Sequence, residues 1–188
     1  MDKNKTAGAK KSAKKTAAKG AEKTAAKGAA KSATKAGKRL QYGALPYRAG
    51  DDGLKVMLVT SRETKRWVIP KGWPMKDRKP HVAAKREAFE EAGVRGQIGK
   101  RPIGTFEYPK RLKSQATVTC KVEVFPLKVR EEAETWPERG EREGRWFSPD
   151  EAAGVVAEAE LRAIIRKLPE LLGRGSPPRR FEPPGQPA

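Results

Sequence analysis

Three glutamates that lie close together offer the clearest chemistry in the sequence. Glu87, Glu90 and Glu91 are spaced i, i+3 and i+4, so on a helix they fall within an arc of roughly 100°. Pro80 suits the first turn of such a helix, and Gly93 suits the residue just past its end. Like charges at this spacing repel one another. A hard divalent cation would offset the repulsion, because such ions prefer carboxylate oxygens.

Short β-rich stretches precede the glutamates and must position them. Residues 42–47 and 54–60 are predicted strands, and the turn signal Asp51-Asp52-Gly53 between them predicts a hairpin. Residues 67–69 form a further predicted strand, which a Pro closes before a constrained loop. We therefore expect the carboxylates to lie on a helix over about 80–92 that follows from this strand and loop.

The chain after the glutamates continues with strand signals. Residues 94–106 contain several glycines and are expected to carry an edge strand. Residues 117–127 alternate as a strand does, with one face formed by Val118, Cys120, Val122 and Val124. We therefore predict that Cys120 is a core residue and not a nucleophile.

Two helices are predicted near the end of the chain. After a charged loop over 131–145, Ser148 and Glu151 have the spacing of a capping box and start a helix. Residues 161–172 form an amphipathic helix that we expect to be interrupted or to end near Pro169. Early strands with interleaved helices predict an α/β domain with a mixed β-sheet.

Charge divides the 188 residues into a tail, a domain and a second tail. Residues 1–39 hold twelve Lys and one Arg against two acidic residues, a net charge of +11 out of +19. This Lys/Ala-rich segment has little to bury, so we expect it to be disordered. Residues 40–172 are long enough for one folded domain, and the Pro/Gly-rich residues 173–188 are predicted to be a flexible tail.

The basic tail predicts a polyanion as a partner. Its composition resembles the lysine/alanine-rich tails of linker-histone-like proteins, which implies salt-sensitive contacts with nucleic-acid phosphates. The alternatives are a solubilising extension and a mitochondrial transit peptide, the latter disfavoured by a single Arg and no apolar face. No stretch approaches the roughly 18 apolar residues that span a bilayer, so we expect no membrane partner. One cysteine and no secretory signal lead us to expect a cytoplasmic location.

The stretch from Gly72 to Val94 resembles the Nudix box. That motif reads Gly, five residues, Glu, seven residues, Arg-Glu, an aliphatic residue, any residue, Glu-Glu, any residue, Gly and an aliphatic residue. Arg78 stands where the motif has its first Glu, which in the family braces the loop through the box Arg, so the departure concerns loop rigidity more than metal binding. The residues that match are Gly72, Arg86, Glu87, Ala88, Glu90, Glu91, Gly93 and Val94.

A wider resemblance covers roughly residues 55–165. The order of Arg62, segment 66–70, the box, segment 103–108 and segment 142–148 is similar to the diphosphoinositol polyphosphate phosphohydrolase branch of the family, whose members also cleave diadenosine polyphosphates. The resemblance implies an α/β/α sandwich and hydrolysis of a diphosphate linkage with Mg²⁺ or Mn²⁺.

The resemblance also implies roles for single residues. Glu87 and Glu91 are the expected metal ligands, together with the main-chain carbonyl of Lys71. Glu90 is the expected general base and an additional candidate ligand, and Arg86 is expected to orient the acidic residues.

Basic loop residues are expected to bind the substrate's phosphates, because a guanidinium can bond two phosphate oxygens at once. These candidates are Arg39, Ser61, Arg62, Lys110, Arg111 and Arg142, with Ser61 as a hydroxyl donor. His81 is expected at the surface and not as a ligand, and Trp73 either stacks on a base or packs within its loop.

The leading hypothesis is a metal-dependent hydrolase that cleaves phosphoanhydride linkages in diphosphoinositol polyphosphates or dinucleoside polyphosphates. An alternative substrate is ADP-ribose or another nucleoside diphosphate derivative, including capped RNA. Pro109 lies 15 residues after Val94, a spacing that resembles that of ADP-ribose-cleaving members of the family. A third hypothesis is a polyanion-binding protein that acts through residues 1–39 and uses its Nudix domain as a sensor.

Overall fold

A computed structural model describes residues 33–34, 38–112 and 116–173. The elements in chain order are β1 (Ala33–Thr34), β2 (Lys38–Gly50), β3 (Gly53–Thr60), β4 (Trp67–Val68), β5 (Lys71–Gly72), α1 (Pro80–Ala92), β6 (Val94–Ile98), β7 (Gly104–Arg111), β8 (Thr117–Glu132), β9 (Gly144–Phe147), α2 (Pro149–Val155) and α3 (Ala159–Gly173). No helix of this described part is long and apolar enough to cross a membrane.

One mixed sheet forms the centre of the molecule. Its axis is the parallel pair of β2 and β8, which runs in register from Arg39 opposite Cys120 to Tyr47 opposite Lys128. On the outer side of β8, β7 and β6 pair antiparallel along successive parts of the strand. On the other side, β2 pairs with β5 and forms the predicted hairpin with β3, which in turn pairs with β4 and β9. The expected mixed sheet is confirmed.

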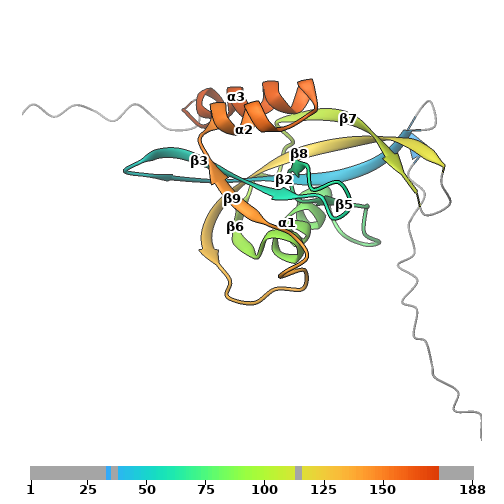
Figure 1. Ribbon diagram of the computed structural model, residues 1–188, viewed down its shortest axis with the longest axis horizontal. Coiled ribbons are helices and arrows are strands. Elements are labelled where there is room, and N and C mark those ends of the chain that lie inside the picture. Colours follow the sequence, from blue (N-terminus) through green and yellow to red (C-terminus); the bar gives the residue numbers. More distant parts are fainter. Residues whose placement is uncertain (1–32, 35–37, 113–115, 174–188) are drawn as a thin grey trace, which may run out of the picture.

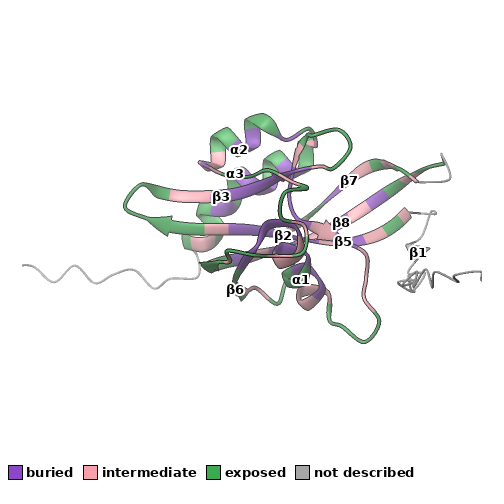
Figure 2. Ribbon diagram, turned by 60° about the horizontal axis from the view of Figure 1, so that its bottom comes forward, coloured by how far each residue is buried: buried purple, intermediate pink, exposed green. Residues whose placement is uncertain are grey.

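Helix α1 covers one face of this sheet (Figures 1 and 2). It begins at Pro80 and ends at Ala92, as predicted, and Gly93 closes it in a left-handed conformation at φ 67° with its N–H on the Phe89 carbonyl. The buried stripe of α1 is lined by small alanines, which let the helix lie close to the strands. Opposite them lie Ala44, Met57, Val59, Val68, Phe125 and Leu127.

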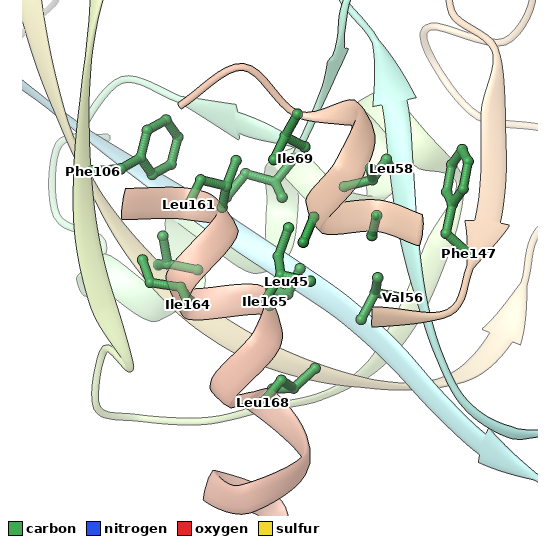
Figure 3. Packing of buried hydrophobic residues seen from close by; sticks show 14 of the residues in the cluster. Leu45, Val56, Leu58, Ile69, Phe106, Phe147, Leu161, Ile164, Ile165 and Leu168 are labelled. Carbon is green, nitrogen blue, oxygen red and sulfur yellow. The ribbon is translucent and has the colours of Figure 1, made fainter. Parts of the chain in front are cut away.

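Helices α2 and α3 cover the opposite face, which makes the α/β/α sandwich that the resemblance implies (Figure 1). Figure 3 shows Leu161, Ile164, Ile165 and Leu168 of α3 packed toward the strand residues Leu45, Val56 and Leu58. The capping box that starts α2 is present: Ser148 Oγ accepts from the Glu151 N–H, and the Glu151 carboxylate accepts from the Ser148 N–H. Cys120 is fully buried, as predicted.

Several elements differ from the sequence prediction. Helix α3 runs through Pro169 to Gly173, because Leu168 is buried against the sheet and Pro169 itself faces solvent. Strand β8 extends to Glu132, since pairing with β6 keeps its polar end extended. Strand β1 and the start of β2 lie within the segment assigned to the basic tail, whose residues 1–32 fall outside the described part.

Candidate active site

The carboxylates of Glu87 and Glu91 lie on the buried stripe of α1, between the helix and β5. Glu87 is 9% exposed and Glu91 is 7% exposed. Gly72 makes this packing feasible, because a Cβ at residue 72 would overlap the Glu87 carboxylate. The glycine of the predicted motif is therefore required for close approach of a metal-ligand candidate to β5.

Both oxygens of Glu91 are engaged. The Lys71 backbone N–H donates to Oε2 at 3.2 Å, and Arg142 Nη2 donates to Oε1 at 2.6 Å. Burial nevertheless raises the pKa of Glu91, since desolvation outweighs the attraction of Lys71 and Arg142, and the charge of Glu138 adds to the rise. The ionised form of Glu91 is thus destabilised by burial, and an additional cation would stabilise it.

Glu90 lies beside this pair at the edge of the buried stripe. Arg86 Nε donates to its Oε1 at 2.7 Å, and its side chain is 17% exposed. This contact explains how the chain tolerates Arg78 in place of the motif's first Glu: Arg86 is bound by Glu90 one turn further along α1, while the exposed Arg78 takes part in a backbone turn with Met75.

The residues fit a hard divalent cation. Two buried carboxylates face β5, and the main-chain carbonyl of Lys71 lies in that strand. Within the described residues no three acidic, His or Cys side chains are gathered into a complete metal site. A donor set of one or two carboxylates that leaves the other positions to water and substrate phosphate is the kind that Mg²⁺ uses.

Cationic side chains form the next layer. The ammonium group of Lys71 lies 5.2 Å from the centre of the Tyr108 ring, and Lys110 lies 4.9 Å from that of Trp73. Burial lowers the pKa of Lys71 to about 8, and the charges of Lys110 and Arg142 act in the same direction while Glu91 opposes them. These cations are therefore near enough to one another to repel, and an anionic ligand would relieve the repulsion. The Lys110 contact joins the Trp73 loop to β7 and does not decide between the two roles predicted for Trp73.

Arg62 and Arg142 meet through Glu138. Arg142 is 11% exposed and donates from Nε to Glu138 at 2.7 Å and from Nη1 to the Thr60 carbonyl at 3.0 Å. Arg62 is 52% exposed and pairs with Glu138 and, at 3.0 Å, with Glu141. Sequence reasoning missed Glu138, because a glutamate in a charged loop carries no periodic signal.

The remaining predicted residues are placed as follows. The Ser61 hydroxyl lies 2.7 Å from Thr64 Oγ1 and accepts from the Arg66 N–H, so it shapes its own loop. Arg39 and Arg111 are exposed on β2 and β7, and within the described residues neither joins the contacts around Glu91. His81 is half-buried with its ring 6.4 Å from that of Phe125.

Comparison with known proteins identifies the family. The family model for the NUDIX domain matches residues 37–171. A two-carboxylate α1 packed on a mixed sheet, together with this match, defines the class: the chain belongs to the Nudix family.

Relatives in sequence are Nudix enzymes. Nudix hydrolase 12 of Arabidopsis thaliana is 38% identical over 61% of this chain and 64% of its own length, and Nudix hydrolase 13 of the same plant is 36% identical over 69% and 73%. Diphosphoinositol polyphosphate phosphohydrolase 3-alpha of Mus musculus is 31% identical over 64% of this chain and 70% of its own. The chain thus spans about two thirds of the length of these relatives.

Solved structures share the fold. An Ap4A hydrolase binary complex from C. elegans aligns with a TM-score of 0.55 and 20% identity over 72% of this chain and 98% of that one. The NUDIX domain of Shewanella oneidensis NrtR with ADP ribose aligns with a TM-score of 0.54 and 18% identity over 74% and 91%.

Proposed function

We propose that this enzyme hydrolyses phosphoanhydride bonds in highly phosphorylated small molecules, either dinucleoside polyphosphates or diphosphoinositol polyphosphates, with Mg²⁺ or Mn²⁺. The observation that carries the proposal is the layer of cations, Lys71, Lys110 and Arg142, set around the buried carboxylates Glu87 and Glu91. Such a layer neutralises several phosphates in one ligand. The names of the mouse relative and the worm structure support the two substrate classes.

Each residue has a task in this reaction. Glu87, Glu91 and the Lys71 carbonyl would hold the metal ion, which when bound neutralises phosphate charge and polarises the scissile linkage. Lys71 and Lys110, whose charges act on each other, would bind the phosphate chain. Glu90 is the base that takes a proton from the attacking water, and the 2.7 Å bond from Arg86 fixes its carboxylate.

A substrate panel tests the proposal. Purified protein with Mg²⁺ or Mn²⁺ is assayed on diadenosine tetraphosphate, a diphosphoinositol pentakisphosphate, ADP-ribose and capped RNA. We expect turnover of at least one of the first two, and a loss of about 10²–10⁴-fold in kcat for Glu90→Gln. Glu87→Gln and Glu91→Gln should reduce the rate by at least about a hundredfold.

Two results would contradict the proposal. One is a folded protein that turns over neither highly phosphorylated class. The other is a clear preference for ADP-ribose or capped RNA, which would select the alternative substrate class instead. Unchanged activity in Glu90→Gln would remove only the assignment of the base.

A second activity follows from the basic tail. Residues 1–32 carry ten Lys against two acidic residues, and that density of positive charge favours binding to nucleic acid. Removing them spares β1 and β2. We expect the truncated protein to keep its hydrolase rate and to lose salt-sensitive DNA or RNA binding. If the truncated protein still binds DNA or RNA at moderate salt, the tail is not the binding segment.

A further inference from the structure

A pocket lies between α1, β6 and β8, apart from the candidate active site. Its volume is about 430 Å³. Helix α1 and β6 lie side by side, as Figures 1 and 2 show. Lys85 precedes the metal-ligand candidate Glu87 by two residues, about 200° around the helix, so the pocket is separate from the carboxylates of the buried stripe. The residues that line the pocket are Lys85, Arg95, Gly96, Gln97, Arg130 and Glu131.

A β-bulge brings consecutive side chains of β8 to this pocket. The register with β6 shifts between Arg95 and Gly96, which leaves Arg130 as the extra residue of β8. In a regular strand Arg130 and Glu131 would point to opposite faces, whereas here both line the pocket. Gly96 permits the irregular register, because a Cβ at this position would overlap a carbonyl oxygen of β8. The backbone is thus shaped so that two arginines of different strands share one pocket.

Both arginines are oriented by neighbouring groups and keep N–H donors for a further partner. The Arg95 guanidinium lies 4.3 Å from the centre of the Phe89 ring, and Arg130 Nη2 donates to Gln97 Oε1 at 3.1 Å. Arg95 also pairs with Glu131 at 3.2 Å, but both side chains are more than half exposed, so a phosphate can replace this weak ion pair. Orienting the guanidinium groups in advance reduces the entropy that is lost when a ligand binds.

The lining of the pocket carries an excess of positive charge. Three cations stand against the carboxylate of Glu131, and among the described residues neither Lys85 nor Arg130 forms an ion pair. A second pocket of similar volume, about 420 Å³, lies between segments 60–67 and 140–143 and has two cations and two carboxylates in its lining. The excess of positive charge is therefore a property of the pocket beside β6 and not of every pocket in this basic protein.

We propose that this pocket binds a compact anion with several phosphate groups, at a site outside the active site. Each guanidinium can bond two phosphate oxygens at once, and Lys85 adds a third positive charge. A volume of about 430 Å³ lies within the range of small-molecule sites, and walls from a helix and two strands suit a compact ligand better than an extended nucleic-acid backbone. Binding here needs neither a metal ion nor hydrolysis, so the inference does not depend on the proposed function.

An NMR titration of the isotope-labelled full-length protein with inorganic tripolyphosphate, without divalent cations, tests the inference. We expect the amide signals of residues 95–97 and 130–131 to shift and to saturate. In the double variant Lys85→Gln/Arg130→Gln, the Kd measured from these signals should rise at least about tenfold, because two of the three cations are lost. Signals of other residues report separately on tripolyphosphate that binds the basic tail or the active site.

The matched control is Arg166→Gln/Lys167→Gln, which removes the same charge from the exposed side of α3 on the opposite face of the sheet. This control should leave the Kd at the pocket unchanged. Pocket signals that do not saturate with tripolyphosphate, or the same Kd in the wild type and in the folded Lys85→Gln/Arg130→Gln variant, would overturn the inference. A short DNA duplex is titrated in parallel. If the duplex shifts the pocket signals and tripolyphosphate does not, the surface is a nucleic-acid contact and the proposal is wrong.

Discussion

Replacing Arg142 by methionine tests how the site balances its charges. Arg142 joins Glu91 of α1 to Glu138 of the following loop, and it also binds the Thr60 carbonyl. Methionine keeps much of the apolar stem and removes the charge. The metal-free protein then holds the buried Glu91 carboxylate without its closest cation.

The structure sets the size of the effect. Arg142 is 11% and Glu91 7% exposed, so this is a buried pair, for which removal of one partner costs about 3–5 kcal/mol. Glu138 keeps its contact with Arg62, which places the expected loss at the lower end, about 3 kcal/mol. For a chain of this size that lowers Tm by about 6–12 °C.

Metal and pH should each reduce the loss. A divalent cation replaces the missing positive charge, so saturating Mn²⁺ should raise Tm more in Arg142→Met than in the wild type. In the variant, burial raises the pKa of Glu91 further, because Arg142 no longer opposes it. A carboxyl with a raised folded pKa destabilises the fold as pH rises above the unfolded value and up to the folded pKa, so the Tm difference should be small below the usual value of 4.5 and widen toward neutral pH.

Thermal unfolding with and without Mn²⁺ at several pH values measures all three effects. Arg62→Met is the control, since Arg62 also binds Glu138 but is 52% exposed, and its loss should cost less than about 1 kcal/mol. The reasoning fails if the two variants are equally stable. An equal Mn²⁺ shift in the wild type and Arg142→Met would refute the charge replacement.

Three further changes probe the site and the fold. Gly72→Ala should displace the Glu87 carboxylate and weaken Mn²⁺ binding about tenfold or more by calorimetry, whereas Gly50→Ala, in open space, should not. Because burial lowers the pKa of Lys71 to about 8, the Lys71 side chain loses its charge as pH rises through that value. The substrate KM should therefore rise above pH 8 in the wild type and stay constant in Lys71→Arg. The same pH dependence of KM in both proteins would show that Lys71 does not bind substrate. Ser148→Ala should lower the free energy of unfolding by about 1 kcal/mol in urea titrations, and an unchanged midpoint would mean that the cap of α2 is not stabilising.

Local signals made part of the fold predictable. Helix α1 starts and ends where Pro80 and Gly93 indicate, and the capping box of α2 is formed within four residues. Local signals did not predict that α3 continues past Pro169, because this part of the helix is stabilised by Leu168, which packs on strands distant in the sequence. The polar end of β8 likewise depends on pairing with β6 and not on its own pattern.

The residues of the candidate site likewise fall into those predictable from local spacing and those placed by tertiary packing. Glu87, Glu90 and Glu91 are neighbours on one helix, so their spacing alone placed them together. Glu138 reaches the site only through tertiary packing of a loop that has no strong pattern of its own. Its recognition required burial and hydrogen bonds, which a sequence does not display.

Acidic and basic side chains of the site are paired with one another. Arg142 binds Glu91, Arg86 binds Glu90, and Arg62 binds Glu138, so the basic residues expected to hold phosphate also act as counter-ions to acidic residues. A divalent cation bound to the carboxylates would weaken their ion pair with Arg142, and the guanidinium could then bind a phosphate. Metal and polyphosphate should therefore bind with positive coupling, because each ligand favours the separation of the carboxylates from Arg142 that the other ligand requires.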